Sequence, residues 1–212
     1  MNQLDLKWLE SVARDLRANG YSVQDGGVPE SLLQALHELR QQLDTAEFQA
    51  AGIGRKRDNQ TDPSVRRDRL CWIEGNSAAG ALWLDWTGQL QRELNRTLLL
   101  GLFSFESHFA HYGPGDFYKT HFDAFKGQAN RCLSAVLYLN PEWSDDWGGQ
   151  LRLYLDESLN DSIDVTPKWG RLVLFLSEDF PHEVMPAARD RYSIAGWFRV
   201  NSSHSQRVDP PK

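Results

Sequence analysis

Apolar residues recur at helical spacing in three segments of the N-terminal half of the chain. The periodicity predicts helices over about residues 3–18, from Pro29 through a stripe of leucines, and over about residues 80–95. Asn19 and Gly20 would end the first helix, because both residue types tolerate a left-handed backbone. A short extended segment, YSVQ, follows this helix, and the strand-like segment LCWI precedes the third helix.

The C-terminal half has a different pattern, in which β-branched, aromatic and alternating segments are separated by Gly, Pro, Asn and Asp. A run of helices followed by many short strands favours a β-sandwich or jelly roll braced by helices on one face. The fold class that we expect is therefore α+β, mainly β. The expected strands are Leu99–Phe109, Lys119–Asp123, Cys132–Leu139, Gly149–Leu155, Ile163–Val165, Leu172–Leu176, His182–Val184 and Tyr192–Val200.

No internal repeat and no linker divides the chain, so we expect a single domain over residues 1–200. Residues 1–97 would supply helical support, and residues 98–200 would form the jelly-roll core. The stretch from Gly52 to Asp68 is charged, rich in turn-forming residues and without periodicity, which is typical of a long mobile loop with a functional role. Residues 201–212 are polar and contain prolines, and we expect this tail to be disordered.

The composition is that of a folded protein, since 41% of the residues are hydrophobic and eight are tryptophan. Acidic residues outnumber basic ones by 29 to 23, which gives a net charge of −6 at pH 7. Nucleic acids and anionic membranes are polyanions, so this charge disfavours both as partners. The segment from Arg55 to Arg69 departs from the overall balance, with six basic and three acidic residues.

Cysteine usage and the N-terminal segment indicate a cytoplasmic protein. Cys71 and Cys132 are isolated and show neither a CxxC motif nor the spacing of a zinc finger. The first residues lack the basic and then apolar profile of a signal peptide, and no apolar run approaches the roughly 20 residues that span a bilayer. We therefore expect neither export nor membrane insertion.

The tripeptide His121-Phe122-Asp123 is the best candidate for metal chemistry, with His182 as a third ligand from a distant segment. On a strand, alternate residues point to the same face, so His121 and Asp123 could reach one metal while Phe122 packs on the other side. Two histidines and one carboxylate with open coordination positions form the facial triad of non-haem Fe(II) oxygenases. The tripeptide alone is a weak signal, because an exposed surface pair has the same spacing.

Arg191 strengthens the metal hypothesis, because it opens the strand that follows the third histidine and could enter the same cavity. Its planar fork matches a carboxylate, which suits the far end of a dicarboxylate cosubstrate that chelates the metal. The alternative is that Arg191 pairs with a local acid, Asp190 or Asp179. The competing pair His108 and His111 lies on opposite faces of a strand, which favours packing or capping over metal binding.

Four ordered motifs extend this signal: HYGPGDFYKTHFD, RCLSAVLYLN, WGGQLRLY and PKWGRLVLFLSEDFPHEVMPAARDRYSIAGWF. Together they resemble the catalytic domain of 2-oxoglutarate- and Fe(II)-dependent prolyl 4-hydroxylases, in particular the HIF prolyl hydroxylase type, in a bacterial member. The segment RRDRLCWIEG extends the likeness upstream, so that it covers about residues 66–200. The resemblance implies a double-stranded β-helix.

The resemblance also implies roles for individual residues. His121, Asp123 and His182 match the iron ligands. Arg191 matches the residue that pairs with the distal carboxylate of 2-oxoglutarate, and Tyr138 matches a tyrosine that hydrogen-bonds the same carboxylate.

Further matches lie around the expected substrate. Tyr112 matches an active-site tyrosine, although the loop that follows it is one residue shorter here than in the family. Residues 52–69 correspond to the mobile loop that folds over the substrate, and its basic part could close over an acidic or extended partner segment. The expected substrate contacts are Arg131, Trp197, Arg66 and Asp68.

The activity implied by the resemblance is peptidyl-prolyl 4-hydroxylation with Fe(II), 2-oxoglutarate and O2, giving succinate and CO2, with ascorbate as a reductant and a link to oxygen sensing. The implied partner is a protein with a target proline, and the bacterial branch has been linked to elongation factor Tu. One alternative is a sister oxygenase that acts on another residue or a small molecule. Another is a β-barrel binding module with a structural, non-redox metal, which would need neither Arg191 nor Tyr138.

Overall fold

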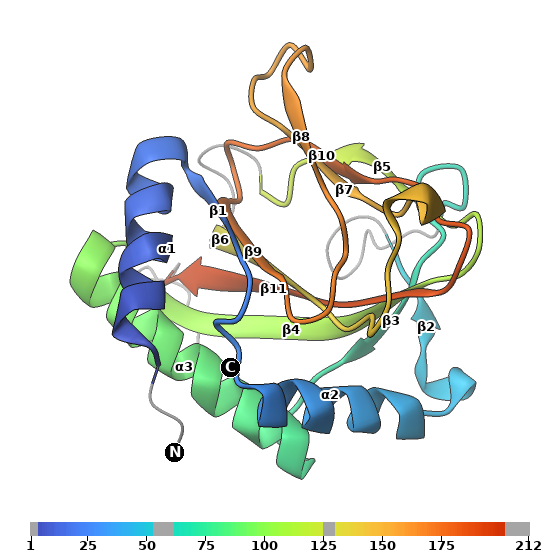
Figure 1. Cartoon of the computed structure of the whole chain (residues 1–212), viewed down its shortest axis with the longest axis horizontal. Coiled ribbons are helices and arrows are strands. Elements are labelled where there is room, and N and C mark those ends of the chain that lie inside the picture. Colours follow the sequence, from blue (N-terminus) through green and yellow to red (C-terminus); the bar gives the residue numbers. More distant parts are fainter. Residues whose placement is uncertain (1–3, 53–61, 125–129, 202–212) are drawn as a thin grey trace, which may run out of the picture.

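A computed structural model describes residues 4–52, 62–124 and 130–201 of the chain. Its three α-helices lie on one side of the molecule (Figure 1). No helix in these ranges combines the length and the apolar character needed to cross a bilayer. The expected disordered tail and most of the expected mobile loop fall on residues 202–212 and 53–61, which lie outside the described residues. The helices are α1 (Leu6–Asn19), α2 (Glu30–Gln42) and α3 (Ala78–Leu98).

The strands form two antiparallel sheets that face each other. The larger sheet has the order β1-β9-β6-β11-β4-β3-β2, and the smaller one has the order β5-β10-β7-β8. This confirms the predicted α+β, mainly β architecture, a jelly roll with helices against one sheet (Figure 1). The strands are β1 (Tyr21–Gln24), β2 (Gln49–Ala50), β3 (Arg69–Trp72), β4 (Leu102–Tyr112), β5 (Tyr118–His121), β6 (Arg131–Tyr138), β7 (Leu151–Tyr154), β8 (Ser162–Val165), β9 (Leu172–Leu176), β10 (His182–Val184) and β11 (Arg191–Val200).

The larger sheet separates two cores, because successive residues of a strand point to opposite faces. On β11, Ile194 and Phe198 pack in the core between this sheet and the helices. Arg191 and Ser193, one position out of phase with them, are buried on the face toward the smaller sheet, where Tyr138 of β6 lies. The same strands therefore hold the helices on one side and present polar groups on the other.

Local capping explains where the elements begin and end. α1 begins at Leu6, later than predicted, because the Asp5 carboxylate accepts hydrogen bonds from the backbone of Lys7 at 2.8 Å and Trp8 at 3.3 Å. It ends as predicted at Gly20, which has a left-handed backbone with φ of 77°.

The strand predicted at Leu99–Phe109 is β4 in the structure, and the prediction was wrong at both ends. Leu99 does not begin a strand, because it closes α3 in the left-handed conformation with φ of 55°, and Gly101 turns the chain with φ of 67°. The strand starts at Leu102 and continues to Tyr112, where pairing with Arg191 of β11 holds it. The shift places Tyr112 beside Arg191.

Gly196 on β11 is required by the packing of the larger sheet. A Cβ atom there would lie 2.6 Å from Cζ of Phe105 and 2.9 Å from the carbonyl oxygen of Glu106. We expect Gly196→Ala to lower the free energy of unfolding by about 1–3 kcal/mol, measured by urea denaturation. The matched control is Gly88→Ala in α3, where the nearest atom would be the Arg92 guanidinium at 3.6 Å. This change should raise stability by about 0.5–1 kcal/mol, and equal effects of both substitutions would contradict the packing argument.

His108 on β4 makes stability depend on pH. Burial lowers its pKa from 6.5 to about 4, so the unfolded chain binds a proton at a higher pH than the folded chain does. The folded state therefore loses stability as the pH falls below the unfolded pKa, by about 2 kcal/mol between pH 7 and pH 5. Urea denaturation at the two pH values should show a smaller loss for His108→Leu than for the wild type. An identical loss would mean that His108 titrates normally in the folded chain.

Candidate active site

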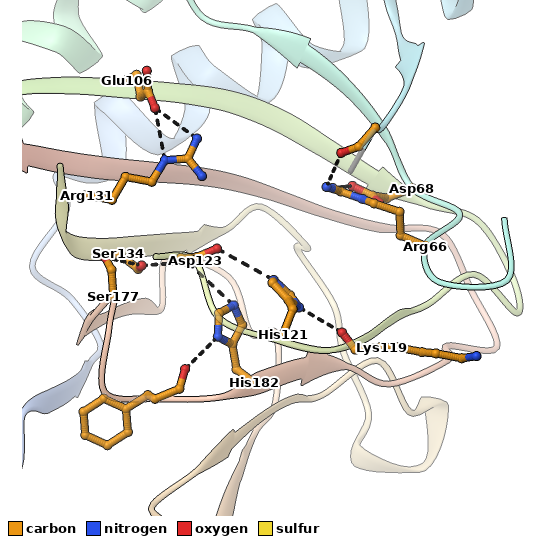
Figure 2. A network of polar contacts seen from close by, with 12 residues as sticks. Arg66, Asp68, Glu106, Lys119, His121, Asp123, Arg131, Ser134, Ser177 and His182 are labelled. Atoms are coloured by element: carbon orange, nitrogen blue, oxygen red, sulfur yellow. Dashed lines mark hydrogen bonds and ion pairs between the residues drawn. The ribbon is translucent and has the colours of Figure 1, made fainter. Parts of the chain in front are cut away.

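His121, Asp123 and His182 come together at one end of the space between the sheets. Their ligand atoms all lie within 4.8 Å of one another, and in the described part of the chain they form the one group of three or more potential metal ligands. The Nε2 atom of His121 is 3.7 Å from one carboxylate oxygen of Asp123, and the Nε2 atom of His182 is 3.6 Å from the other (Figure 2). The histidines face each other as a register pair of β5 and β10.

Asp123 reaches the site by a different route from the one predicted. β5 ends at His121, and Asp123 lies in the bend that follows it, so the alternation of a strand does not place its carboxylate. The carboxylate is held instead by Ser134 of β6, whose hydroxyl donates to it at 2.7 Å, and Ser134 also contacts the Ser177 hydroxyl at 2.9 Å. Asp123, which lies outside the strands of the smaller sheet, is therefore held in place by the larger sheet.

Backbone hydrogen bonds orient both imidazole rings (Figure 2). The Nδ1 atom of His121 lies 2.9 Å from the carbonyl of Lys119, and that of His182 lies 3.1 Å from the carbonyl of Phe180. A carbonyl only accepts, so each Nδ1 carries the proton and each Nε2 keeps its lone pair toward Asp123. This is the tautomer that a metal at Nε2 requires.

The protonation states suit a cation. Burial alone would favour the neutral form of Asp123, but His182, His121 and Ser134 together hold the pKa of this carboxyl far below its usual value. Burial, followed by the neighbouring His121, lowers the pKa of His182 to about 4. At neutral pH the group therefore offers a carboxylate and a neutral imidazole, the forms that bind metals. The residues fit an Fe(II) ion.

Arg191 is a fully buried cation without a carboxylate partner among the described residues. Its Nε donates to the carbonyl of Gly149 at 2.8 Å and its Nη1 donates to Ser193 at 3.3 Å. Its Nη2 and the hydroxyl of Tyr138 are buried and find no partner in the described part of the chain. Asp190 is engaged by His111 at 2.7 Å, so the local pairing considered for Arg191 is absent there.

Two tyrosine rings enclose the guanidinium of Arg191. The ring centroids of Tyr112 and Tyr138 each lie 5.0 Å from its central carbon. A buried cation is costly unless an anion or hydrogen bonds compensate it, and two donors are left free here. The donor set therefore fits the carboxylate of a bound dicarboxylate such as 2-oxoglutarate.

The predicted substrate residues Arg131 and Trp197 lie on the same face of the larger sheet, next to Ser134. Arg131 stacks on the Trp197 ring at 3.5 Å from the centroid and pairs with Glu106 at 3.0 Å. Trp197 faces Ser134 in the register of β11 with β6, and Ser134 holds Asp123. This cation and aromatic ring therefore lie one strand from the ligand group.

Arg66 and Asp68 form a tight pair rather than a free basic patch. Two guanidinium nitrogens of Arg66 donate to the two oxygens of Asp68 at 2.7 and 2.6 Å, and Asp68 is buried (Figure 2). Arg66 also stacks on Tyr118 at 4.0 Å, and the Tyr118 ring lies parallel to His121 with centroids 3.5 Å apart. The base of the predicted lid thus contacts a candidate metal ligand through one tyrosine.

The predicted lid lies only partly within the described residues. Arg55, Lys56 and Arg57 lie outside the described residues. Of the described cations, Arg66 is neutralised by its acid, and the Arg69 side chain donates to the carbonyl of Phe48 at 2.8 Å.

Several contacts of the site have no clear sequence signal. Nothing in the alternation of β6 singles out Ser134 or, on the next segment, Ser177. Tyr118 could have been noticed, because it precedes His121 by three positions in a matched motif. Trp72 of β3 is 49% exposed and packs edge-on against His108 at 5.3 Å between centroids, which extends the aromatic surface around Trp197.

Known proteins agree with this geometry. A sequence profile of the 2OG-Fe(II) oxygenase superfamily matches residues 107–199, which include all three candidate ligands and Arg191. Human Egl nine homolog 1 is 28% identical over 201 residues, which cover 90% of this chain and 46% of the human protein. The chain spans about half the length of the Egl nine homolog 1 proteins from human, rat and mouse.

Solved structures extend the match. A prolyl-4-hydroxylase from Pseudomonas putida is 40% identical, with a TM-score of 0.82 over 92% of this chain and 100% of that one. A prolyl hydroxylase from Trichoplax adhaerens, in complex with a fragment of hypoxia inducible factor, is 28% identical, with a TM-score of 0.77 over 91% of this chain and 89% of that one. The chain therefore belongs to the 2-oxoglutarate- and Fe(II)-dependent oxygenase superfamily and, within it, to the HIF prolyl hydroxylase-like family.

Proposed function

We propose that the protein is a cytoplasmic prolyl 4-hydroxylase, which uses O2 and 2-oxoglutarate to hydroxylate a proline of a protein substrate and gives succinate and CO2. The observation that carries the proposal is the pair of unsatisfied buried donors on Arg191 and Tyr138, between the same sheets as the three-residue ligand group. A structural metal in a binding module needs no such donors. A dicarboxylate that chelates a metal needs a partner for its far end.

The names of the relatives support proline as the target. The Pseudomonas putida protein is named a prolyl-4-hydroxylase, and the Trichoplax adhaerens enzyme is bound to a peptide fragment of hypoxia inducible factor. We propose elongation factor Tu as the substrate, because the resemblance of the motifs is to the bacterial branch of the group. Ascorbate is the expected reductant, and cytoplasmic action agrees with the free thiols of Cys71 and Cys132.

The side chains divide the work of the reaction. His121, Asp123 and His182 would hold Fe(II), while Arg191 and Tyr138 would bind and orient 2-oxoglutarate through its far carboxylate. Once bound, Fe(II) and 2-oxoglutarate supply the oxidation, in which one oxygen atom of O2 enters the prolyl ring and the other enters succinate. The two sheets exclude water and hold the groups in fixed relative positions.

The surface around Trp197 would position the peptide. Trp197 and Trp72 offer apolar rings, and Arg131 is held over Trp197 by its pair with Glu106. A proline ring packs well on such surfaces, and the guanidinium can bind an acidic or carbonyl group of the neighbouring peptide.

Arg191 is expected to control the affinity for 2-oxoglutarate. Replacement by Gln removes the charge, so the kcat/KM for 2-oxoglutarate should fall by about 100-fold in a succinate-release assay, while the binding of Mn(II) is kept. The matched control is Arg96→Gln, which removes an exposed arginine paired with Glu93 on α3 and should leave this ratio unchanged. Unaltered kinetics in Arg191→Gln would remove 2-oxoglutarate from this position.

The substrate assignment is tested by mass spectrometry of elongation factor Tu incubated with the enzyme, Fe(II), 2-oxoglutarate and ascorbate. We expect a mass gain of one oxygen atom on a prolyl residue with the wild type and none with Asp123→Ala, which lacks a ligand. Succinate release with oxidation of a different residue or a small molecule would identify a sister oxygenase. Absence of succinate together with tight metal binding would identify a binding module.

A further inference from the structure

A second pocket lies between the end of α2, the loop after β6 and the start of β11. Its volume is about 340 Å³, within the range of small-molecule sites. It shares no lining residue with the candidate metal ligands or with the predicted 2-oxoglutarate and peptide contacts. The lining residues that determine its chemistry are Arg40, Trp143, Trp147, Arg189 and Tyr192.

Arg40 is a partly buried cation at this pocket. Its guanidinium lies 4.0 Å from the centroid of the Tyr192 ring, and its Nη2 donates to Nδ1 of His37 at 3.4 Å. Its Nε is buried without a hydrogen-bond partner in the described chain, and the charge of Asp190 acts on the guanidinium without forming an ion pair with it there. Burial lowers the pKa of Arg40, but a guanidinium stays charged in proteins. An anion in the pocket would offset the cost of burying this charge.

His37 keeps Arg40 in place. A guanidinium has no acceptor, so the His37 Nδ1 must accept the hydrogen bond and must be unprotonated. Burial, together with the charge of Arg40, lowers the pKa of His37 and favours this neutral form. Stacking on Tyr192 and bonding to His37 therefore orient the guanidinium before any ligand arrives.

Arg189 and two tryptophans complete the pocket. Arg189 lies 4.3 Å from the centroid of the Trp147 ring, and it forms no ion pair with a carboxylate in the described chain. The rings of Trp143 and Trp147 meet edge to face, with centroids 5.8 Å apart at 75°. The Nε1 of Trp143 donates to the carbonyl of Gly148 at 3.0 Å, which fixes the ring. The pocket thus combines a rigid apolar corner with two guanidinium groups.

The remaining charges of the lining limit the kind of anion. Glu142 and Asp190 also line the pocket, so its cations and acids are equal in number. Asp190 is bonded to His111 at 2.7 Å, and its charge also acts on Arg40, although no ion pair joins these two residues in the described chain. A singly charged carboxylate can bind the arginines with little repulsion, whereas a phosphate dianion would meet both acids.

We propose that this pocket binds a small organic carboxylate, with the carboxylate between Arg40 and Arg189 and a flat apolar group against Trp143 and Trp147. The site is separate from the one at Arg191 and does not depend on the proposed hydroxylase activity. The paired guanidinium forks recognise the charge, and the tryptophan corner recognises the apolar group.

Benzoate is a suitable probe, with benzamide as its neutral isostere and phenyl phosphate as its dianionic counterpart. Binding is followed by NMR of the tryptophan indole N–H groups in the full chain, loaded with Zn(II) and saturating 2-oxoglutarate so that the site at Arg191 is blocked. Benzoate should shift the Trp143 and Trp147 resonances, which Trp143→Phe and Trp147→Phe assign. Benzamide and phenyl phosphate should bind at least about tenfold more weakly.

Arg189→Gln tests the charge without endangering the fold, because Arg189 is exposed. It should weaken benzoate binding at least about tenfold, as should Arg40→Met, whereas Arg14→Gln, at an exposed arginine of α1, should leave it unchanged. The proposal is overturned if Arg189→Gln binds benzoate like the wild type, or if benzamide or phenyl phosphate binds as tightly as benzoate. Absence of any saturable shift at the two indoles overturns it as well.

Discussion

The burial of two opposite charges between the sheets governs the arrangement of the site. The Ser134 hydroxyl donates to the buried Asp123 carboxylate, whose pKa is far below its usual value, and Arg191 meets only neutral oxygens and tyrosine rings in the described chain. The charges do not neutralise each other, so one end of the cavity calls for a cation and the other for an anion. A metal ion chelated by a dicarboxylate would supply both at once.

The two sheets contribute unequally to this site. The smaller sheet supplies both histidines, but its strands are short and largely exposed on their outer side. The larger sheet is braced by the helix core and holds Asp123 through Ser134. Arg66 and Tyr118 are paired as a β-bridge, and the Tyr118 ring stacks on the His121 ring. Contacts of Ser134 with Asp123 and of Tyr118 with His121 therefore hold the ligand group in place before a metal binds.

Much of the fold and the chemical identity of the site could be predicted from the sequence, because both depend on local periodicity and on a few rare residue types. Strand ends were less predictable, since Leu99 became a helix cap and β5 stopped before Asp123. The role of Ser134 depends on a contact between distant segments, which alternation does not reveal. The pairing of Arg66 with Asp68 could not be read from composition, which gives the charges of this segment but not their partners.

The alternation along β11 has a consequence for how such an enzyme can diversify. Its two sets of side chains meet different requirements, since Ile194 and Phe198 pack in the helix core while Arg191 and Trp197 lie on the opposite face of the strand. Substitutions on one face of β11 therefore need no compensating substitutions on its other face. A lineage, or a laboratory library restricted to the positions on the face of Trp197, could therefore change the chemistry of that face while keeping the packing against the helices unaltered.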